Sequence, residues 1–288
     1  MSPISRSARF LADTAFLLVA GSLAATLLFR LTPGAETDPS DLTPGLSSES
    51  LEARRAERRK TLSTTGQSVA YFVGILRGDF GKSTLSGAPV SGLMLDRAPA
   101  TAWLVGSGAL LGLVAGLLLA VAAVLIYPGL PETIVTTGFL GLLSLPAGLL
   151  VLAAIFTRLP LELAVGAAVA PRVYFYASRL LARQRNAGYV LQAVATGIGP
   201  VRIAALHVLP ALRSELSALA GFSIVTALAA AIPAEALSGR PGIGQLAWRS
   251  AMERDLPVLV AVTLCLLLAS RAVTLLSDVP PRESRFAA

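Results

Sequence analysis

Long apolar stretches separated by shorter polar connections dominate the chain. A helix that crosses a bilayer needs about 20 mostly apolar residues, because a hydrocarbon core about 30 Å thick is crossed at about 1.5 Å per residue. Backbone groups in lipid must be hydrogen-bonded within their own segment, so each such stretch predicts a helix. The sequence therefore predicts an all-α integral membrane protein with about six transmembrane helices, at about 10–29, 100–126, 134–156, 161–181, 216–236 and 256–276.

The first apolar stretch resembles a secretory signal peptide in its opening, because Arg6 and Arg9 precede it. It is longer than the apolar part of a signal peptide, ends at Arg30 and lacks a clear cleavage site. We therefore expect it to remain on the protein as a membrane anchor.

Several charged residues lie in or near predicted spans. The fourth stretch contains Glu162 and Arg172, the fifth ends near Glu235, and the sixth contains Arg271. Such side chains are costly in lipid unless they face protein or water, which makes them candidates for a polar pathway or a structural contact. The alternative is that they reach the membrane surface from a helix end.

Small residues suggest where two helices approach closely. Gly108, Gly112 and Gly116 follow one another at four-residue spacing in the second stretch. That spacing places three positions without side chains on one helix face, where a second helix can pack.

Prolines interrupt three of the predicted spans. Pro146, Pro171 and Pro233 lack the backbone N–H that continues a helical ladder. We expect each to kink its helix.

Composition supports a membrane protein and excludes several classes of function. Apolar residues make up 54% of the chain and charged residues only 14%, against about 25% in soluble domains. A single cysteine, Cys265, cannot form an intrachain disulfide or a Cys-based metal cage. Only one histidine, His207, is present, so a His-rich metal site is excluded as well. We expect no metal site and no catalytic residue.

Basic residues indicate the orientation. The connection between the fourth and fifth stretches is rich in arginine, and arginines also flank both ends of the chain. Short loops rich in Lys and Arg stay on the cytoplasmic side, which predicts that both termini are cytoplasmic. The chain then divides into a cytoplasmic N-terminus with the first span (1–31), an extracytoplasmic loop (32–99) and a five-helix core (100–288) with a cytoplasmic loop at about 183–213.

One short motif suggests nucleotide binding and fails on spacing. Gly81-Lys82-Ser83 resembles the end of a phosphate-binding loop, but that loop needs a further glycine where Leu76 stands. No paired residues typical of an intramembrane protease are recognisable either. Any ATP-driven step would therefore need an ATPase on another chain.

Three ordered segments resemble the inner-membrane permease subunits of dipeptide, oligopeptide and nickel ABC importers. The first runs through Arg77-Gly78-Asp79 to Arg97 and the Pro-Ala-Thr at 99–101, where the second span begins. The second resembles the cytoplasmic "EAA" loop of ABC permeases, with Gly197 and Leu209-Pro210 at the family spacing. The third, at 241–258, is similar to the segment that leads into the last helix.

The resemblance implies a MetI-like (type I) permease fold and a transport role. The subunit would pair with a second homologous permease, two cytoplasmic ATP-binding subunits and an extracytoplasmic substrate-binding protein. It would itself bind no cofactor, because ATP and Mg would sit on the ATPase, and it would contact no nucleic acid. Cargo would be a peptide or a related small solute such as a nickel chelate or an opine. The protein would lie in the bacterial inner membrane, moving cargo by alternating access.

The same resemblance assigns residues to the loop that couples the permease to the ATPase. Gly197 would permit the tight turn between two short helices of this loop. Leu191 and Gln192 stand where the family has Glu and its first Ala, and His207 takes the Ile position. The coupling residues are Tyr189, Gln192, Ala193, Gly197, Arg202, His207, Leu209 and Pro210.

Two other functions remain open from the sequence. An accessory membrane subunit derived from such a permease, but no longer transporting, is favoured by the lost Glu and by the short external stretch at about 157–160. A membrane enzyme or secondary carrier working alone would need a catalytic pair or inverted repeats, and neither is visible.

Overall fold

A computed structural model describes residue 16 and residues 80–83, 85–126 and 130–277. The predicted first span, 10–29, lies outside the described residues apart from Phe16, and so does most of the expected loop 32–99. The described part of the chain is almost entirely helical and holds no strand, which confirms an all-α fold. An isolated bridge between Lys82 and Pro89 is its nearest approach to a sheet.

The chain divides into two compact units. Unit 1 includes Arg249–Cys265 and the residues up to Asp96, and unit 2 comprises Arg97–Trp248 and the residues from Leu266 on. In unit 1 a loop before α4 lies against the start of the last helix, since the hydroxyl of Ser83 donates to the buried carboxylate of Asp255. The first and third segments of the permease resemblance thus meet here. Within unit 2 they are joined again, because Arg97 donates to Gln245 at 3.0 Å and the N–H of Ile243 donates to the hydroxyl of Thr101 at 2.8 Å.

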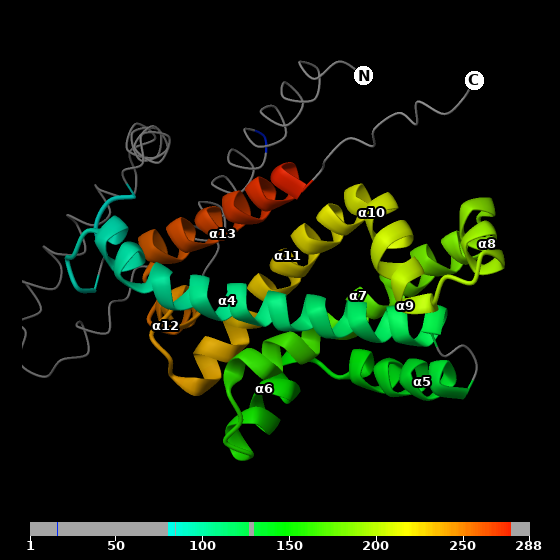
Figure 1. The fold of residues 1–288 in the computed structure, drawn as a ribbon. Helices are drawn as coiled ribbons and strands as arrows, with labels where there is room; N and C mark the ends of the chain where they lie inside the picture. The colour runs from blue at the N-terminus through cyan, green and yellow to red at the C-terminus, as the bar shows by residue number, and fades with distance from the viewer. Residues whose placement is uncertain (1–15, 17–79, 84, 127–129, 278–288) are drawn as a thin grey trace, which may run out of the picture. The chain divides into compact units, whose positions relative to one another are not determined.

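Helix α7 (Leu161–Arg185) is central to unit 2. It packs against α5 (Leu130–Ser144), α6 (Ala147–Phe156) and α11 (Arg213–Ser238), as Figure 1 shows. Its buried positions recur every three or four residues on more than one face, because neighbours cover it on several sides. They include Ala164, Val165, Ala168, Val169, Val173, Tyr174, Ala177 and Leu181.

Three described helices are long and apolar enough to cross a membrane. They are α4 (Val90–Val121) with its continuation η2 (Ala122–Ile126), α11, and α13 (Leu256–Ser277). These helices contain the predicted second, fifth and sixth spans. Helix α4 begins ten residues before the predicted start at 100, and Pro99 lies inside it. Helix α12 (Ile243–Met252) is short and precedes α13.

The predicted third span, 134–156, is wrong as a single helix. The chain bends by 97° between α5 and α6, with Pro146 in extended conformation at the break. At about 1.5 Å per residue the ten residues of α6 span only about 15 Å, which is half a bilayer core. The pair is a broken span or a re-entrant loop, and counting it as one span raises the total in the described chain to four.

Pro171 and Pro233 have a milder effect than Pro146. Both lie inside continuous helices, α7 and α11. Neighbouring helices stabilise these segments, so the loss of one backbone hydrogen bond does not end them.

The predicted fourth span, 161–181, is a helix but is not apolar enough to count as a span on its own. Glu162, Arg172 and the arginines of its last turns lower its hydropathy. Its many buried residues show that other parts of unit 2 cover much of its surface.

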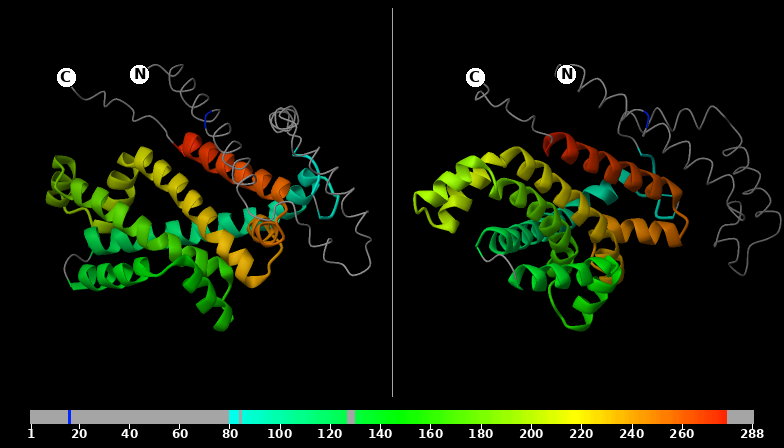
Figure 2. Two further views of the ribbon diagram at one scale, coloured as in Figure 1. Left: turned by 180° about the vertical axis from the view of Figure 1, so that it is seen from behind. Right: turned by 90° about the vertical axis from the view of Figure 1, so that its right-hand side faces the viewer.

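A chain of short helices connects α7 to α11. It consists of α8 (Gly188–Ala195), α9 (Pro200–Ile203), η3 (Ala204–Val208) and α10 (Leu209–Ala211), with a wide π-type turn at η3. We call residues 188–211 the hairpin. In both views of Figure 2, α8 lies at the extremity of unit 2.

Candidate functional site

The hairpin turns sharply at a glycine-stabilised helix end. Gly197 has φ +79°, a left-handed conformation that other residues adopt only at a cost. The N–H of Gly197 donates to the carbonyl of Val194 at 3.0 Å, and the N–H of Ile198 donates to that of Ala193 at 3.1 Å. This pair of bonds is a Schellman motif, which ends α8 and redirects the chain into α9, where Pro200 takes the first helical position.

The inner face of the hairpin is anchored to the rest of unit 2. Val190 and Ala193 of α8 and Ile203 and Val208 beyond the turn are buried in the main apolar core. Helix α9 also contacts η2, so the hairpin rests on the end of α4 as well as on α7. The hairpin is therefore in direct contact with α7 and with η2, the continuation of α4.

The outer face of the hairpin presents apolar side chains that the described chain leaves uncovered. Leu191 is 57% exposed and Val194 is 58% exposed, and Val201 and Leu206 are exposed as well. Large apolar side chains gathered on an exposed surface are typical of a protein docking surface.

The predicted coupling residues do not all lie on that outer face. Gln192, Arg202 and Pro210 are exposed, whereas Ala193 is buried and His207 and Leu209 are partly buried. The side chain of Tyr189 is exposed, and its hydroxyl donates to the side-chain oxygen of Gln184 at 2.8 Å. Partial burial raises the pKa of Tyr189, which keeps its hydroxyl protonated. Leu191, which replaces the family's Glu, is part of the exposed apolar surface.

The three glycines of α4 face α7. A β-carbon built on Gly112 would lie 2.5 Å from the Cβ of Val169, and one on Gly116 would lie 2.6 Å from the carbonyl oxygen of Ala170. Gly108 meets Val165 in the same way. The structure therefore places this stripe at a close helix contact.

Glu162 pairs with a residue distant in sequence. Its carboxylate accepts from Arg240 at 2.8 Å, which joins the start of α7 to the segment after α11. Glu162 thus has a structural contact in this conformation.

Glu235 is fully buried near the end of α11. Its Oε2 accepts from the backbone N–H of Gly244 at 2.6 Å, and Gly242 packs directly against the same carboxyl group. Glu235 therefore holds the glycine-rich segment 242–244 against α11.

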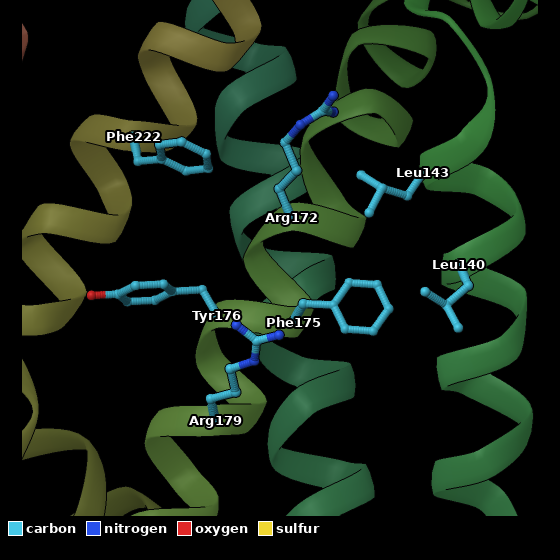
Figure 3. A pocket seen from close by; sticks show the side chains of 7 residues that line it. All are labelled: Leu140, Leu143, Arg172, Phe175, Tyr176, Arg179 and Phe222. Carbon is cyan, nitrogen blue, oxygen red and sulfur yellow. The ribbon is translucent and has the colours of Figure 1, made fainter.

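Arg172 lies apart from these contacts, in an open cleft of about 400 Å³. Figure 3 shows it between Phe222 of α11 on one side and Leu143 of α5 on the other. The cleft is lined by Leu140, Leu143, Arg172, Phe175, Tyr176, Arg179 and Phe222. The residues predicted for coupling, for packing and for a polar pathway thus occupy different places in unit 2.

The sequence interpretation missed two features of this cleft. Arg179 and Tyr176 share a helix face with Arg172, and the spacing of four and three residues could have indicated it. Phe222 of α11 comes from a distant segment, and no local signal points to it. Among the described residues, no group of three or more His, Cys, Asp or Glu side chains could hold a metal ion.

Comparison with known families gives one match. The family described as "Binding-protein-dependent transport system inner membrane component" matches residues 112–279, which is more than half of the chain. No curated protein matches the sequence. The matched range includes α7, the hairpin, α11 and all of α13, and it begins inside α4.

Proposed function

The chain belongs to the family of inner-membrane components of binding-protein-dependent transport systems, and on that premise we propose that this permease subunit couples to its ATPase through the hairpin 188–211. The exposed apolar surface of the hairpin would dock on one of two cytoplasmic ATP-binding subunits. ATP and Mg would bind there, and this chain would perform no covalent chemistry.

The observation that carries the proposal is the construction of the hairpin. One face is buried in the core of unit 2, and the other presents Leu191, Val194 and Val201 to the outside. A segment that is packed into the core on one face and exposes apolar side chains on the other can bind a partner and transmit the partner's movement to the core. Movement of the hairpin would shift α7 and α11, which flank it in the chain, and so open the pathway to alternate sides of the membrane.

The remaining parts of the assembly follow from the same proposal. A second homologous permease would complete the pathway, and a substrate-binding protein would deliver cargo from outside. Both termini and the hairpin would be cytoplasmic, because the arginines near the hairpin favour that side. The cargo would be a peptide or a related small solute, such as a nickel chelate or an opine. This expectation rests on the resemblance of the segment 76–101 and the hairpin to peptide importers.

A second function has one structural observation in its favour. Only Thr157–Pro160 connect α6 to α7, which leaves little chain for docking a substrate-binding protein. An accessory subunit that no longer transports would tolerate such a connection. Substrate-stimulated ATP hydrolysis by the purified assembly distinguishes the two, because an accessory subunit would not be needed for it.

Co-purification tests the docking surface. The tagged chain is extracted from its native membrane in mild detergent, and bound proteins are identified by mass spectrometry. Leu191→Asp places a charge in the proposed contact and should lower the recovered ATP-binding subunit by about tenfold or more, since about 1.4 kcal/mol corresponds to tenfold.

A matched control separates docking from general damage. Met252 is 63% exposed and lies outside the hairpin, so Met252→Asp introduces the same charge at a similar exposure. It should leave the recovery of the ATP-binding subunit unchanged. Equal recovery with Leu191→Asp and the unaltered chain would overturn the assignment of the hairpin.

A further inference from the structure

Two arginines lie on one face of the central helix of unit 2. Arg172 lies 11 residues from Leu161 and 13 from Arg185, so it is about 16 Å and 20 Å from the two ends of α7. Arg179 follows two turns later, and Tyr176 lies between them on the same face. A guanidinium is costly beside lipid, which indicates that this face of α7 meets water, protein or a ligand.

The cleft around these arginines contains no compensating negative charge. None of its seven lining residues is acidic, and within the described chain neither arginine forms an ion pair. Arg172 donates from one nitrogen to the carbonyl of Ala168 in its own helix. A guanidinium has five N–H donors, so most of the donors of this pair remain available.

The remaining walls of the cleft are apolar. Leu140 and Leu143 come from α5, Phe175 from α7 and Phe222 from α11 (Figure 3). A ligand that is complementary to both the arginines and the apolar lining carries an anionic group and an apolar group. Arginine suits this role, because its planar fork binds a carboxylate through two parallel hydrogen bonds.

We propose that Arg172 and Arg179 bind the carboxylate of the transported solute, while the leucines and phenylalanines of the cleft hold its apolar part. This inference rests on the proposed transport function and narrows the cargo to carboxylate-bearing solutes with an apolar side chain. The carboxylate of the solute would then offset the positive charge of the two guanidinium groups during passage.

Paired probes that differ by one charge test the proposal. The full-length chain is placed in nanodiscs of phosphatidylcholine and titrated calorimetrically with N-acetyl-leucyl-leucine or with its C-terminal amide. The acid should bind at least about tenfold more tightly than the amide, because charge-assisted bonds to arginine are lost in the amide.

Variants assign that preference to the cleft. Arg172→Gln and Arg179→Gln should each reduce the preference for the acid to a ratio near one, and Arg179→Lys should retain part of it. Arg249→Gln is the matched control, because Arg249 is exposed and pairs only with Glu253 in the described chain; it should leave the ratio unchanged. If a glutamine variant elutes as an aggregate, the lysine variant at the same position is used instead. Its acid-to-amide affinity ratio should be measurable and lower than that of the wild type.

Two results would overturn the proposal. One is a wild-type chain that binds acid and amide equally, or neither of them. The other is a loss of acid binding in nanodiscs that contain phosphatidylglycerol, combined with co-purification of phosphatidylglycerol with the wild type but not with Arg179→Gln. Together these two observations would mean that the arginines bind a lipid headgroup. Neither result would contradict the proposed docking of the hairpin, because the ATP-binding subunit should still co-purify with the arginine variants.

Discussion

At the scale of single residues, Glu235 links two segments through a carboxylate that water does not reach. It is 0% exposed, and its Oε2 accepts from the N–H of Gly244 at 2.6 Å. Glycine is required at 242, because a β-carbon there would collide with the carboxyl group. The carboxyl group of Glu235 is therefore packed tightly against the segment 242–244.

Replacing this carboxylate should destabilise the protein. Glu235→Ala leaves the Gly244 N–H buried without its acceptor, which costs about 1–3 kcal/mol, and it also opens a cavity. Thermal unfolding of the purified chain in detergent measures the loss.

Glu253 supplies the comparison for Glu235. It is exposed and forms a surface ion pair with Arg249 at 3.2 Å, which is worth about 0–1 kcal/mol. Glu253→Ala should therefore unfold close to the unaltered temperature. If Glu235→Ala were as stable as Glu253→Ala, the linking role of Glu235 would be excluded.

At the scale of elements, the contact between α4 and α7 depends on the absence of side chains. Gly112→Ala would place a β-carbon 2.5 Å from the Cβ of Val169 and 2.8 Å from the carbonyl oxygen of Gly166. Overpacking of this kind costs about 1–3 kcal/mol, which outweighs the gain of about 1 kcal/mol in helix propensity. The unfolding temperature in detergent should fall.

A second glycine of α4 provides a control in the same helix. A β-carbon on Gly106 meets nothing within 4 Å in the described structure. Gly106→Ala should therefore unfold at an equal or higher temperature. Equal stability of the two variants would mean that α4 and α7 do not approach as closely as the geometry indicates.

The hairpin turn offers a third comparison. Gly197 has φ +79°, whereas Gly199, two residues later, has φ −66°. Gly197→Val should strain the turn by about 1–2 kcal/mol or more and abolish substrate-stimulated ATP hydrolysis, while the chain still inserts in the membrane. Position 199 does not need a left-handed backbone, so Gly199→Val should retain substrate-stimulated ATP hydrolysis. If both variants lost this stimulation, or if neither did, the role of the turn would be contradicted.

Pattern predicts these elements to different degrees. The apolar runs of α4, α11 and α13 are long and uninterrupted, so their positions follow from hydropathy alone. The break at Pro146 does not, because Pro171 and Pro233 also lie within predicted spans and yet leave their helices continuous. Whether a proline breaks or merely perturbs a helix depends on the neighbours that replace the lost hydrogen bond, and the sequence does not show those neighbours.

The site shows the same division. The glycine stripe and the turn at Gly197 are local patterns, and the structure places both at close contacts or tight turns. The partners of Glu162 and Glu235 are Arg240 and Gly244, which only the folded chain brings to them. The cleft around Arg172 combines three helices and could not be assembled from spacing along one of them.

At the scale of the whole molecule, the family match gives a transport role to a chain whose hairpin has one buried and one exposed apolar face. We propose that this exposed face binds a separate ATP-binding subunit in the cytoplasm. Everything proposed about alternating access depends on this contact.

Photo-crosslinking at position 191 in intact cells tests the contact most directly. A photoreactive amino acid replaces Leu191, the cells are irradiated, and the crosslinked protein is identified by mass spectrometry, with the same substitution at Met252 for comparison. The account predicts that position 191 captures an ATP-binding subunit and that position 252 does not. Capture of an extracytoplasmic protein at position 191, or of the ATP-binding subunit at both positions alike, would contradict it.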